Sequence, residues 1–373
     1  MILYEFEVKE LLEEAGVPVE RSCLVKSVAE ARRCTETLRP PFMLKAQVRG
    51  WGRGKKGFVK KAVNVDELES GVSELLGKRY GGVEIRYVLV SEYVEHQKEL
   101  YLSFMADGDS RRHLMLASVS GGVDVEESGE ILEVELSPAL GFRPYLGRWL
   151  AAFWDVDWRD ALGLAGRLYE VFLKYKLRLL EVNPIAVTSE GLVAIDRKAI
   201  VDDDAVSGTR LEEFWKRYLD ELQPIERKAV ENGLSFVMLD GEIGVIGNGA
   251  GLTMATMDIV SEMGGRPAFF LDVGGGASSE RVKLAVETAF QLPNVKAVIV
   301  NILGGITRCD EVARGLLSAI GEDDTLKEKL FVRLAGLNEE EGNYILKEAG
   351  VPVFNEPLEL IKRAVEYVYS DRT

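Results

Sequence analysis

Short apolar runs alternate with amphipathic helical patterns throughout the second half of the chain. The predicted strands there are 243–247, 267–273, 296–303, 330–336 and 351–354. The predicted helices that follow them are 252–263, 279–292, 309–321, 339–350 and 357–370. Short buried strands that alternate with helices form a parallel sheet with helices on both faces, and ligands bind at the carboxyl ends of the strands. This half is therefore predicted to be an α/β, doubly wound parallel-sheet domain.

The first half has a different rhythm, because its strand patterns follow one another as hairpins. Strand patterns lie at 41–48, 87–95, 98–106, 111–120 and 179–195, and helical patterns at 1–16, 27–38 and 158–176. Strands paired mainly by hairpins, with separate helices, are typical of an α+β domain. A polar run at 221–233 marks the join, so we predict one domain at 1–222, a linker at 223–234 and a second domain at 235–373.

The hairpin at 179–195 carries polar residues where a buried core is expected. Glu181 and Asn183 are two positions apart, so on a strand they share a face. The predicted turn has its midpoint between Ser189 and Glu190, which places Asn183 opposite Asp196. An amide oxygen and a carboxylate are hard ligands that suit Mg²⁺, which takes its remaining ligands from water and phosphate. The alternative is a hydrogen-bonded polar pair at the edge of a sheet.

Residues 50–57, GWGRGKKG, form a glycine-rich basic loop directly after the strand that carries Lys45. Backbone N–H groups in such a loop approach anions closely, and Arg53 adds positive charge. The loop does not fit the Walker pattern, and a solvated turn is the alternative. A buried lysine needs a partner, and for Lys45 a phosphate is a natural one.

Three further stretches are candidate binding elements. Glu92, Val94 and Glu99 lie on a segment that suits adenine through its backbone and ribose through a carboxylate, or that is simply an exposed charged loop. The turns at 247–252 and 303–311 combine glycines with a helix start, which favours anion binding, although such turns also serve packing alone. Leu252 stands where a dinucleotide fingerprint needs its last glycine, so a nicotinamide site is disfavoured.

Composition excludes several classes of partner. The net charge of −15 and the isoelectric point near 4.9 disfavour nucleic acid and anionic membranes. The sequence has no uninterrupted apolar run of about 18 residues, so no membrane span is predicted. The three cysteines lack metal-type spacing and cannot form a disulfide framework, so we expect free structural cysteines and a reducing compartment. The two histidines, His96 and His113, have no nucleophile-like neighbours and are expected at the surface.

Taken together, these motifs resemble the β subunits of succinyl-CoA synthetases, in the same order and nearly from end to end. The resemblance rests on Lys45 with GRG at 52–54, KELYL at 98–102, LLEVNP at 179–184, AIDRK at 194–198, NGAGLTMATMDIV at 248–260, FLDVGGGASSERV at 270–282 and VNILGGITRCD at 300–310. It implies an ATP-grasp fold for the first half and a flavodoxin-like CoA-ligase domain for the second. Arg197 and Ala335 depart from the family, which usually has glycine and glutamate at these two positions.

The resemblance also implies roles for individual residues. The nucleotide, ATP or GTP with its diphosphate, would contact Lys45, Gly52, Arg53, Gly54, Glu92, Val94 and Glu99. Mg²⁺ would be held by Asn183 and Asp196. Glu181 would face a phosphorylated histidine on a companion α subunit. The acid would meet Asn248, Gly305, Ile306 and Thr307.

The implied reaction is reversible and converts an acid, CoA and a nucleoside triphosphate into acyl-CoA, diphosphate and phosphate. It proceeds through an acyl phosphate and a phosphohistidine, and the α subunit supplies the histidine and the main CoA site in an αβ or α2β2 assembly. Succinate is the expected acid, and malate or acetate the alternatives. Other ATP-grasp ligases would leave the second half unexplained, and a non-catalytic nucleotide-binding protein would not need the metal pair. A cytoplasmic location is expected, with the mitochondrial matrix the alternative.

Overall fold

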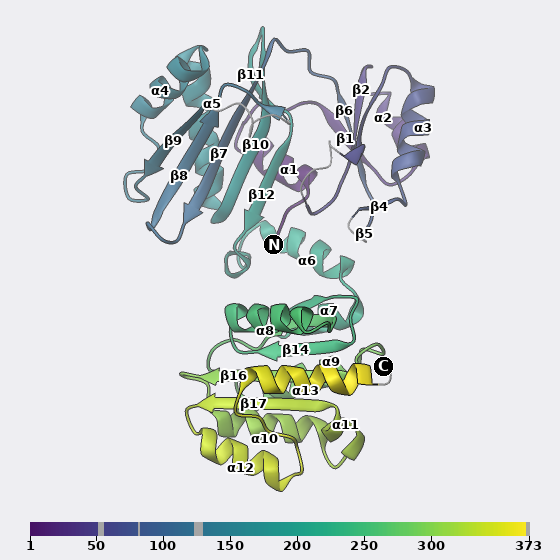
Figure 1. Ribbon diagram of the computed structural model, residues 1–373. Helices are drawn as coiled ribbons and strands as arrows, with labels where there is room; N and C mark the ends of the chain where they lie inside the picture. The colour runs from purple at the N-terminus through teal and green to yellow at the C-terminus, as the bar shows by residue number, and fades with distance from the viewer. Residues whose placement is uncertain (51–55, 81–82, 123–129, 371–373) are drawn as a thin grey trace. The chain divides into compact units, whose positions relative to one another are not determined.

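In the computed structural model the chain divides between Arg217 and Tyr218 into two units (Figure 1). The structure describes residues 1–373 except 51–55, 81–82, 123–129 and 371–373. The division lies five residues before the predicted end of the first domain at 222, within helix α6 (Leu211–Glu221). The predicted linker contains a further helix, α7 (Pro224–Glu231), which packs against the second unit's strand β13.

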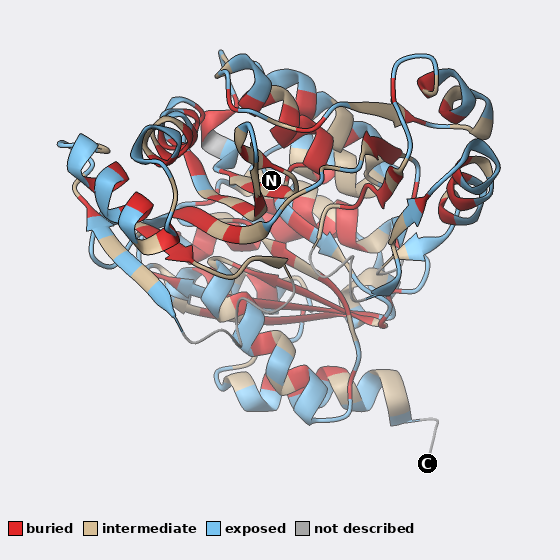
Figure 2. Cartoon of the chain, turned by 90° about the horizontal axis from the view of Figure 1, so that it is seen from above, coloured by how far each residue is buried: buried red, intermediate tan, exposed pale blue. Residues whose placement is uncertain are grey.

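The first unit is built around a six-stranded antiparallel sheet with the order β11-β10-β7-β8-β9, in which β12 also pairs with β10. The strands are β7 (Lys98–Asp107), β8 (Arg112–Ser118), β9 (Ile131–Leu136), β10 (Leu177–Thr188), β11 (Gly191–Ala194) and β12 (Arg197–Val201). One face packs against α1 (Glu5–Glu14), α4 (Pro144–Trp154) and α5 (Trp158–Lys174) in the largest core of this unit. Figure 2 shows that buried and exposed segments alternate along the helices and strands of the chain.

Helix α5 illustrates how the sequence sets an element of this core. The Asp157 carboxylate caps its first turn by accepting a hydrogen bond from the Arg159 N–H at 2.8 Å. Leu164, Leu168 and Phe172 recur at four-residue spacing, so they form one apolar stripe, and all three are buried. The stripe lies against the sheet, where Phe172 contacts Phe104 of β7.

The same unit contains a second antiparallel sheet of four strands, with the order β1-β6-β2-β3. These are β1 (Ser22–Val25), β2 (Phe42–Ala46), β3 (Val59–Ala62) and β6 (Val88–Glu92), and a separate short pair is formed by β4 (Arg79–Tyr80) and β5 (Val83–Glu84). Helices α2 (Val28–Cys34) and α3 (Val65–Leu75) share a core with the four-stranded sheet. Helix α2 begins where predicted, because the Ser27 hydroxyl accepts a hydrogen bond from the Glu30 N–H.

One prediction about this sheet is wrong. Cys23 of β1 and Cys34 of α2 form a disulfide, and only Cys309 is a free cysteine among the three. Spacing along the sequence does not show this pairing, because a strand and a helix bring the two side chains together across eleven positions. The bond ties α2 to the edge of the sheet.

The second unit is the doubly wound sheet that the sequence predicts. Its order is β13-β15-β14-β16-β17, with β13 antiparallel at one edge and the other four strands parallel. The strands are β13 (Ser235–Met238), β14 (Ile243–Gly247), β15 (Pro267–Asp272), β16 (Ala297–Gly304) and β17 (Leu330–Gly336). The segment 351–354 makes one isolated parallel bridge, between Val332 and Val353, instead of the predicted strand.

Helices cover both faces of this parallel sheet. They are α8 (Ala250–Glu262), α9 (Ser279–Phe290), α10 (Cys309–Ile320), α11 (Asp324–Glu328), α12 (Glu339–Glu348) and α13 (Pro357–Tyr369). Two separate cores result, one that includes α9 and α10 and one that includes α13. The carboxyl ends of β14, β15 and β16 lead into the glycine-rich turns of the predicted anion sites, which fixes where those turns meet.

Candidate functional site

The six-stranded sheet has one polar face, which carries three of the predicted nucleotide and metal residues of the first unit, Glu99, Asn183 and Asp196, together with Glu181. On β7, Leu100, Leu102 and Phe104 are buried in the core beside α5, so Glu99, Tyr101 and Ser103 point to the other side. On β10, Glu181 and Asn183 alternate in the same way with buried Val182. Glu181 is opposite Ser103 in the strand register, so both strands contribute to this face.

The predicted pairing of Asn183 with Asp196 is confirmed. Thr188 pairs with Gly191, Ile185 with Ala194 and Val182 with Arg197, and this one register places Asn183 opposite Asp196. The Asn183 N–H donates to the Asp196 carbonyl oxygen at 2.9 Å. Asp196 lies in the bend between β11 and β12, directly across from Asn183, so the two predicted ligands stand at the same point of the polar face.

The Asn183 side chain is oriented by the backbone of Gly122. Its Oδ1 accepts a hydrogen bond from the Gly122 N–H at 2.6 Å, and its Nδ2 donates to the Gly122 carbonyl at 3.1 Å. An amide oxygen has two lone pairs, so Oδ1 can accept from Gly122 and still bind a cation. No cluster of three or more His, Cys, Asp or Glu is found among the described residues. One amide and one carboxylate fit Mg²⁺ nonetheless, because phosphate and water complete its shell.

Glu181 lies beside this pair, half-buried on the same face. Its Oε1 is 3.5 Å from the Lys198 ammonium, and the two residues are opposite each other in the sheet. Burial raises the pKa of the neighbouring Tyr101 phenol, and the Glu181 charge raises it further. Glu181 thus pairs with one lysine on the polar face.

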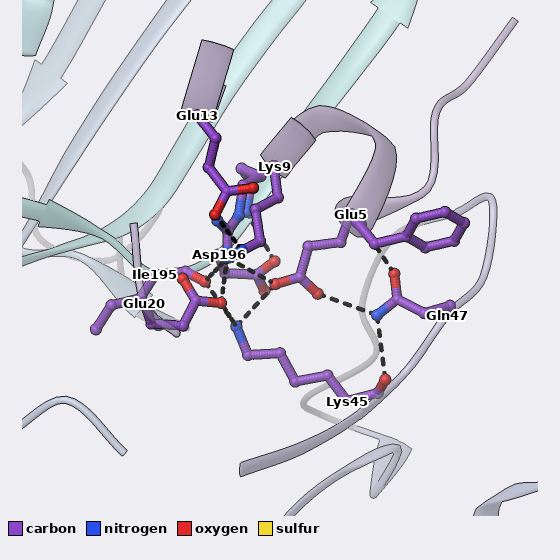
Figure 3. Close-up of polar contacts among 10 residues, drawn as sticks. Glu5, Lys9, Glu13, Glu20, Lys45, Gln47, Ile195 and Asp196 are labelled. Carbon is purple, nitrogen blue, oxygen red and sulfur yellow. Dashed lines mark hydrogen bonds and ion pairs between the residues drawn. The ribbon is translucent and has the colours of Figure 1, made fainter. Parts of the chain in front are cut away.

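Lys45 belongs to a cluster of buried charges that joins elements of both sheets of the first unit. Figure 3 shows its ammonium directed at Glu5, at Glu20 and at the Ile195 carbonyl, with Nζ distances of 2.7, 3.6 and 2.6 Å. Burial alone lowers the pKa of Lys45, but Glu5, Glu20 and Asp196 outweigh it and raise the pKa. The expectation that a phosphate would be its natural partner is thus incomplete, because protein carboxylates already balance its charge.

Arg197 is the second cation of this cluster, and its side chain is fully buried. Its Nη2 contacts Glu20 at short range, Glu5 at 3.4 Å and the Ile195 carbonyl at 2.6 Å. Burial lowers the pKa of the guanidinium, while Glu20 and Glu5 raise it above the ordinary value. Arg197 is therefore part of a charge network beside the candidate metal ligand.

The predicted base and ribose residues separate in the structure. Glu92 ends β6 and accepts a hydrogen bond from the Arg39 N–H at 2.8 Å. It pairs with Phe42, three positions along β2 from Lys45. Val94 is half-buried, and its carbonyl lies 2.8 Å from the His96 ring. Glu99 is on the polar face, beside the Gly122 that holds Asn183. Of this group, the structure brings only Glu99 into the neighbourhood of the metal pair.

Both histidines are half-buried, so their predicted surface location is wrong. His96 has Nδ1 at 2.8 Å from the Val94 carbonyl and Nε2 at 3.0 Å from Glu99. His113 has Nδ1 at 2.8 Å from the Tyr169 hydroxyl and packs edge-on against Phe172. The remaining predicted phosphate contacts, Gly52, Arg53 and Gly54, lie outside the described residues.

In the second unit, two of the four predicted acid-binding residues, Asn248 and Thr307, meet at the carboxyl edge of the parallel sheet. Asn248 follows β14, and its side chain bridges to the Leu303 backbone and to the Thr307 hydroxyl at 2.9 and 3.2 Å. Thr307 is buried and accepts a hydrogen bond from the Gly276 N–H at 2.9 Å. Gly305 and Ile306 are exposed at the tip of the same turn, with Ile306 76% exposed.

Two acidic residues that sequence reasoning did not single out hold this edge together. The Asp272 carboxylate accepts hydrogen bonds from the Gly249 and Gly274 N–H groups at 2.6 and 2.7 Å. Asp310, in the first turn of α10, is fully buried and is bound by Arg308, Arg314 and Asn338. The Arg308 guanidinium is the main reason that the pKa of Asp310 lies well below its usual range. Asp272 lies within the motif 270–282, and this motif was the sequence signal from which its role could have been predicted.

Among the residues that the structure describes, no helix is long and apolar enough to cross a membrane.

Comparison with known proteins agrees with both units. Residues 2–187 match the family model of the ATP-grasp domain, and residues 246–364 match that of the CoA-ligase. The β subunit of the ADP-forming succinate–CoA ligase of Pyrobaculum arsenaticum is 40% identical over 378 residues, covering 98% of this chain and 99% of that protein. The corresponding subunit of Staphylothermus marinus is 42% identical and covers 98% of each chain.

A solved structure shows the same fold at much lower identity. The ATP citrate lyase of Methanothrix soehngenii, in complex with citrate and coenzyme A, superposes with a TM-score of 0.71 at 19% identity. The match covers 98% of this chain and 99% of that one, so the order of the two units is shared. Nearly full-length identity of about 40% to several curated relatives confirms the resemblance predicted from the motifs. The chain belongs to the family of β subunits of ADP-forming succinate–CoA ligases.

Proposed function

We propose that this chain is the nucleotide-binding subunit of a succinate–CoA ligase, which converts succinate, CoA and ATP reversibly into succinyl-CoA, ADP and phosphate. The observation that carries the proposal is the opposition of Asn183 and Asp196 on the polar face of a sheet that also presents Glu181 and Glu99. Two oxygen ligands and a further carboxylate on one face are what phosphoryl transfer from a nucleotide needs.

On this reading the first unit binds and orients the nucleotide. Asn183 Oδ1 and the Asp196 carboxylate would hold Mg²⁺, which neutralises phosphate charge when it is bound. Lys45 stands behind the pair as a fixed positive charge, and Arg53 with Gly52 and Gly54 would contact the phosphates. Glu99, held by His96, would accept hydrogen bonds from the ribose. Glu92 and Val94 would lie toward the base.

The reaction also needs a nucleophile, and we place it on a separate α subunit. Both histidines of this chain are already engaged, His96 with Glu99 and Val94, and His113 with Tyr169. Glu181 would bond one ring nitrogen of the α subunit's histidine, which fixes the tautomer and leaves the other nitrogen free to take the phosphoryl group. The histidine would then pass the phosphoryl group to succinate, which gives an acyl phosphate. The CoA thiol would attack the acyl carbon of this intermediate and release phosphate.

The second unit would contribute the turn that meets the acid. Asn248, Gly305, Ile306 and Thr307 form the carboxyl edge of β14 and β16, where backbone N–H groups near a helix start favour anions. Succinate is proposed as the acid because the relatives carry that name, whereas malate and acetate remain alternatives on chemical grounds. Cytoplasmic location is part of the proposal, and the disulfide does not contradict it, because disulfides also occur inside hyperthermophilic cells.

The test is reconstitution with an α subunit of this family. The purified pair is assayed with ATP or GTP, CoA and a panel of succinate, malate, acetate and citrate, with acyl-CoA quantified by mass spectrometry. We expect succinyl-CoA as the main product, and only when both subunits and Mg²⁺ are present. A preference for another acid would replace the substrate but keep the chemistry, and no acyl-CoA from any acid would overturn the proposal.

A further inference from the structure

We propose that Arg197 is a positioning residue that fixes the metal-ligating carboxylate of Asp196 from the opposite face of the hairpin, with Glu20 as its permanent counter-ion. The proposal rests on the proposed function, because it concerns the same metal pair. It goes beyond that function, because it assigns a task to a residue that stands where the family usually has glycine.

The strand register places the two side chains on opposite faces. Asp196 is opposite Asn183 and faces the polar side, whereas Arg197 is opposite Val182, whose side chain is in the core. The Arg197 side chain is fully buried. It therefore lies behind the metal pair, where it cannot contact a nucleotide directly.

Arg197 fixes the chain on both sides of Asp196. Its guanidinium donates to the Ile195 carbonyl at 2.6 Å, and its own backbone N–H donates to Asp196 Oδ1 at 2.9 Å. Lys45 donates to the same Ile195 carbonyl at 2.6 Å. The peptide unit that leads into Asp196 is thus held by two cations. The bond to Asp196 Oδ1 comes from the backbone and is kept by any residue except proline at 197, so the arginine side chain acts through the Ile195 carbonyl.

The arrangement is a poor one for stability alone. Among the residues that the structure describes, Arg197 Nε and Nη1 and Glu20 Oε2 are buried and have no hydrogen-bond partner. Unsatisfied buried donors cost desolvation free energy, and a buried ion pair is often no more stable than an apolar replacement. Within the described part of the chain, only one nitrogen of the Arg197 guanidinium has hydrogen-bond partners. The contact of this nitrogen with the backbone at 195–196 explains the presence of the arginine better than a gain in stability does.

The cluster of buried charges allows a double variant that keeps its net charge. Glu5 and Glu20 are opposed by Lys45 and Arg197, so removing Arg197 alone would leave two carboxylates to share one ammonium. Removing Glu20 and Arg197 together leaves the Glu5–Lys45 pair, at 2.7 Å, in place. The double variant Glu20→Gln/Arg197→Met therefore removes the clamp without changing the net charge near the metal site.

The experiment measures metal binding by calorimetry, as Mg²⁺ titrated into the chain saturated with ADP, and separately measures ADP binding without metal. For the double variant we expect metal affinity to fall about 5- to 20-fold, while metal-free ADP affinity stays within about twofold because Lys45 keeps Glu5. Val182→Ala is the matched control, since it disturbs the same core face without touching the Ile195 carbonyl. It should leave both affinities unchanged.

A mutant cycle separates positioning from general loosening. In an Asp196→Ala background the double variant should cause no further loss of metal affinity, because the carboxylate that it positions is already gone. An equal loss in both backgrounds, or no loss in either, would overturn the proposal. If Asp196→Ala alone leaves metal affinity unchanged, the metal site itself is wrong and the proposed function falls with it. Should the double variant fold poorly, Arg197→Lys keeps the charge and should give an intermediate affinity.

Discussion

The backbone N–H of Asn183 donates to the carbonyl of Asp196 at 2.9 Å, and this single bond fixes two candidate metal ligands opposite each other. Asn183 lies on β10 and Asp196 in the bend between β11 and β12, and the pairings on both sides of them, Val182 with Arg197 and Ile185 with Ala194, follow the same register. A one-residue slip would turn both side chains into the core, so the geometry of the site depends on the register of one hairpin.

Replacing Asp196 should therefore abolish function without unfolding the protein. We expect Asp196→Ala, assayed with an α subunit at limiting Mg²⁺, to lower phosphoryl transfer at least about 100-fold, the scale of losing one electrostatic contact in an active site. Glu190→Ala is the matched control, because Glu190 is an exposed carboxylate at the tip of the same hairpin. Normal turnover by Asp196→Ala would disprove the metal assignment.

This pairing was predictable because a hairpin is local. The midpoint of the turn at 189–190 and the two-residue period of a strand determine which residues are opposite, and no distant contact is needed. The order of strands and helices in the second unit was predictable for the same reason, since each apolar run is followed by its own helix. The last predicted strand, 351–354, failed because it is at the sheet's edge, where only Val353 bridges.

The cysteines give a direct chemical prediction. With Cys23 and Cys34 joined, alkylation of the unfolded but unreduced chain should label one cysteine, and alkylation after reduction should label three. Mass spectrometry distinguishes the two states. Closing a loop of this length stabilises a protein by about 3 kcal/mol, so Cys23→Ser/Cys34→Ser should lower the free energy of unfolding by roughly that amount. Three labelled cysteines without reductant would show that the disulfide does not form.

Asp310 should be essential for the stability of the second unit. Its carboxylate is fully buried and is held by Arg308 at 2.8 Å and Arg314 at 2.7 Å. Asp310→Asn removes the carboxylate that binds Arg308 and leaves Arg314 with Glu311 and Glu341, so we expect the free energy of unfolding to fall by about 1.5 to 3 kcal/mol, the scale of a hydrogen bond to a charged group. Asp324→Asn is the control, because that carboxylate is exposed and pairs only with Lys327. Equal denaturant midpoints for the two variants would contradict the expectation.

The environment of His113 predicts a component of acid sensitivity. Burial lowers the pKa of its imidazole below the ordinary value of 6.5. The unfolded chain therefore takes up a proton on this histidine more readily than the folded chain does. The free energy of unfolding then decreases as the pH falls below about 6.5. His113→Asn removes this titration while keeping a polar group near the Tyr169 hydroxyl. Unfolding between pH 8 and pH 5.5 should show a smaller loss of stability for the variant, and identical losses would refute the assignment.

The buried charge cluster was beyond sequence reasoning. Lys45 was recognised as a lysine that needs a partner, but its partners come from Glu5, 40 positions earlier, and from the Ile195 carbonyl, 150 positions later. Neither spacing follows a helix or strand period, so no local sequence pattern indicates these two contacts. The half-buried histidines were missed for the same reason, because the aromatic neighbours of His113 lie on α5, about 56 positions away.

The central claim, that this subunit binds the nucleotide while another polypeptide carries the phosphorylated histidine, is tested by incubating the purified chain with γ-labelled ATP and Mg²⁺. The reaction is run with and without an α subunit, and acid-labile label is measured on each separated polypeptide. We predict label on the α subunit alone, and strongly reduced label when Glu181→Gln replaces the wild-type chain. Stoichiometric acid-labile label on this chain without an α subunit, removed by His96→Ala or His113→Ala, would contradict the account.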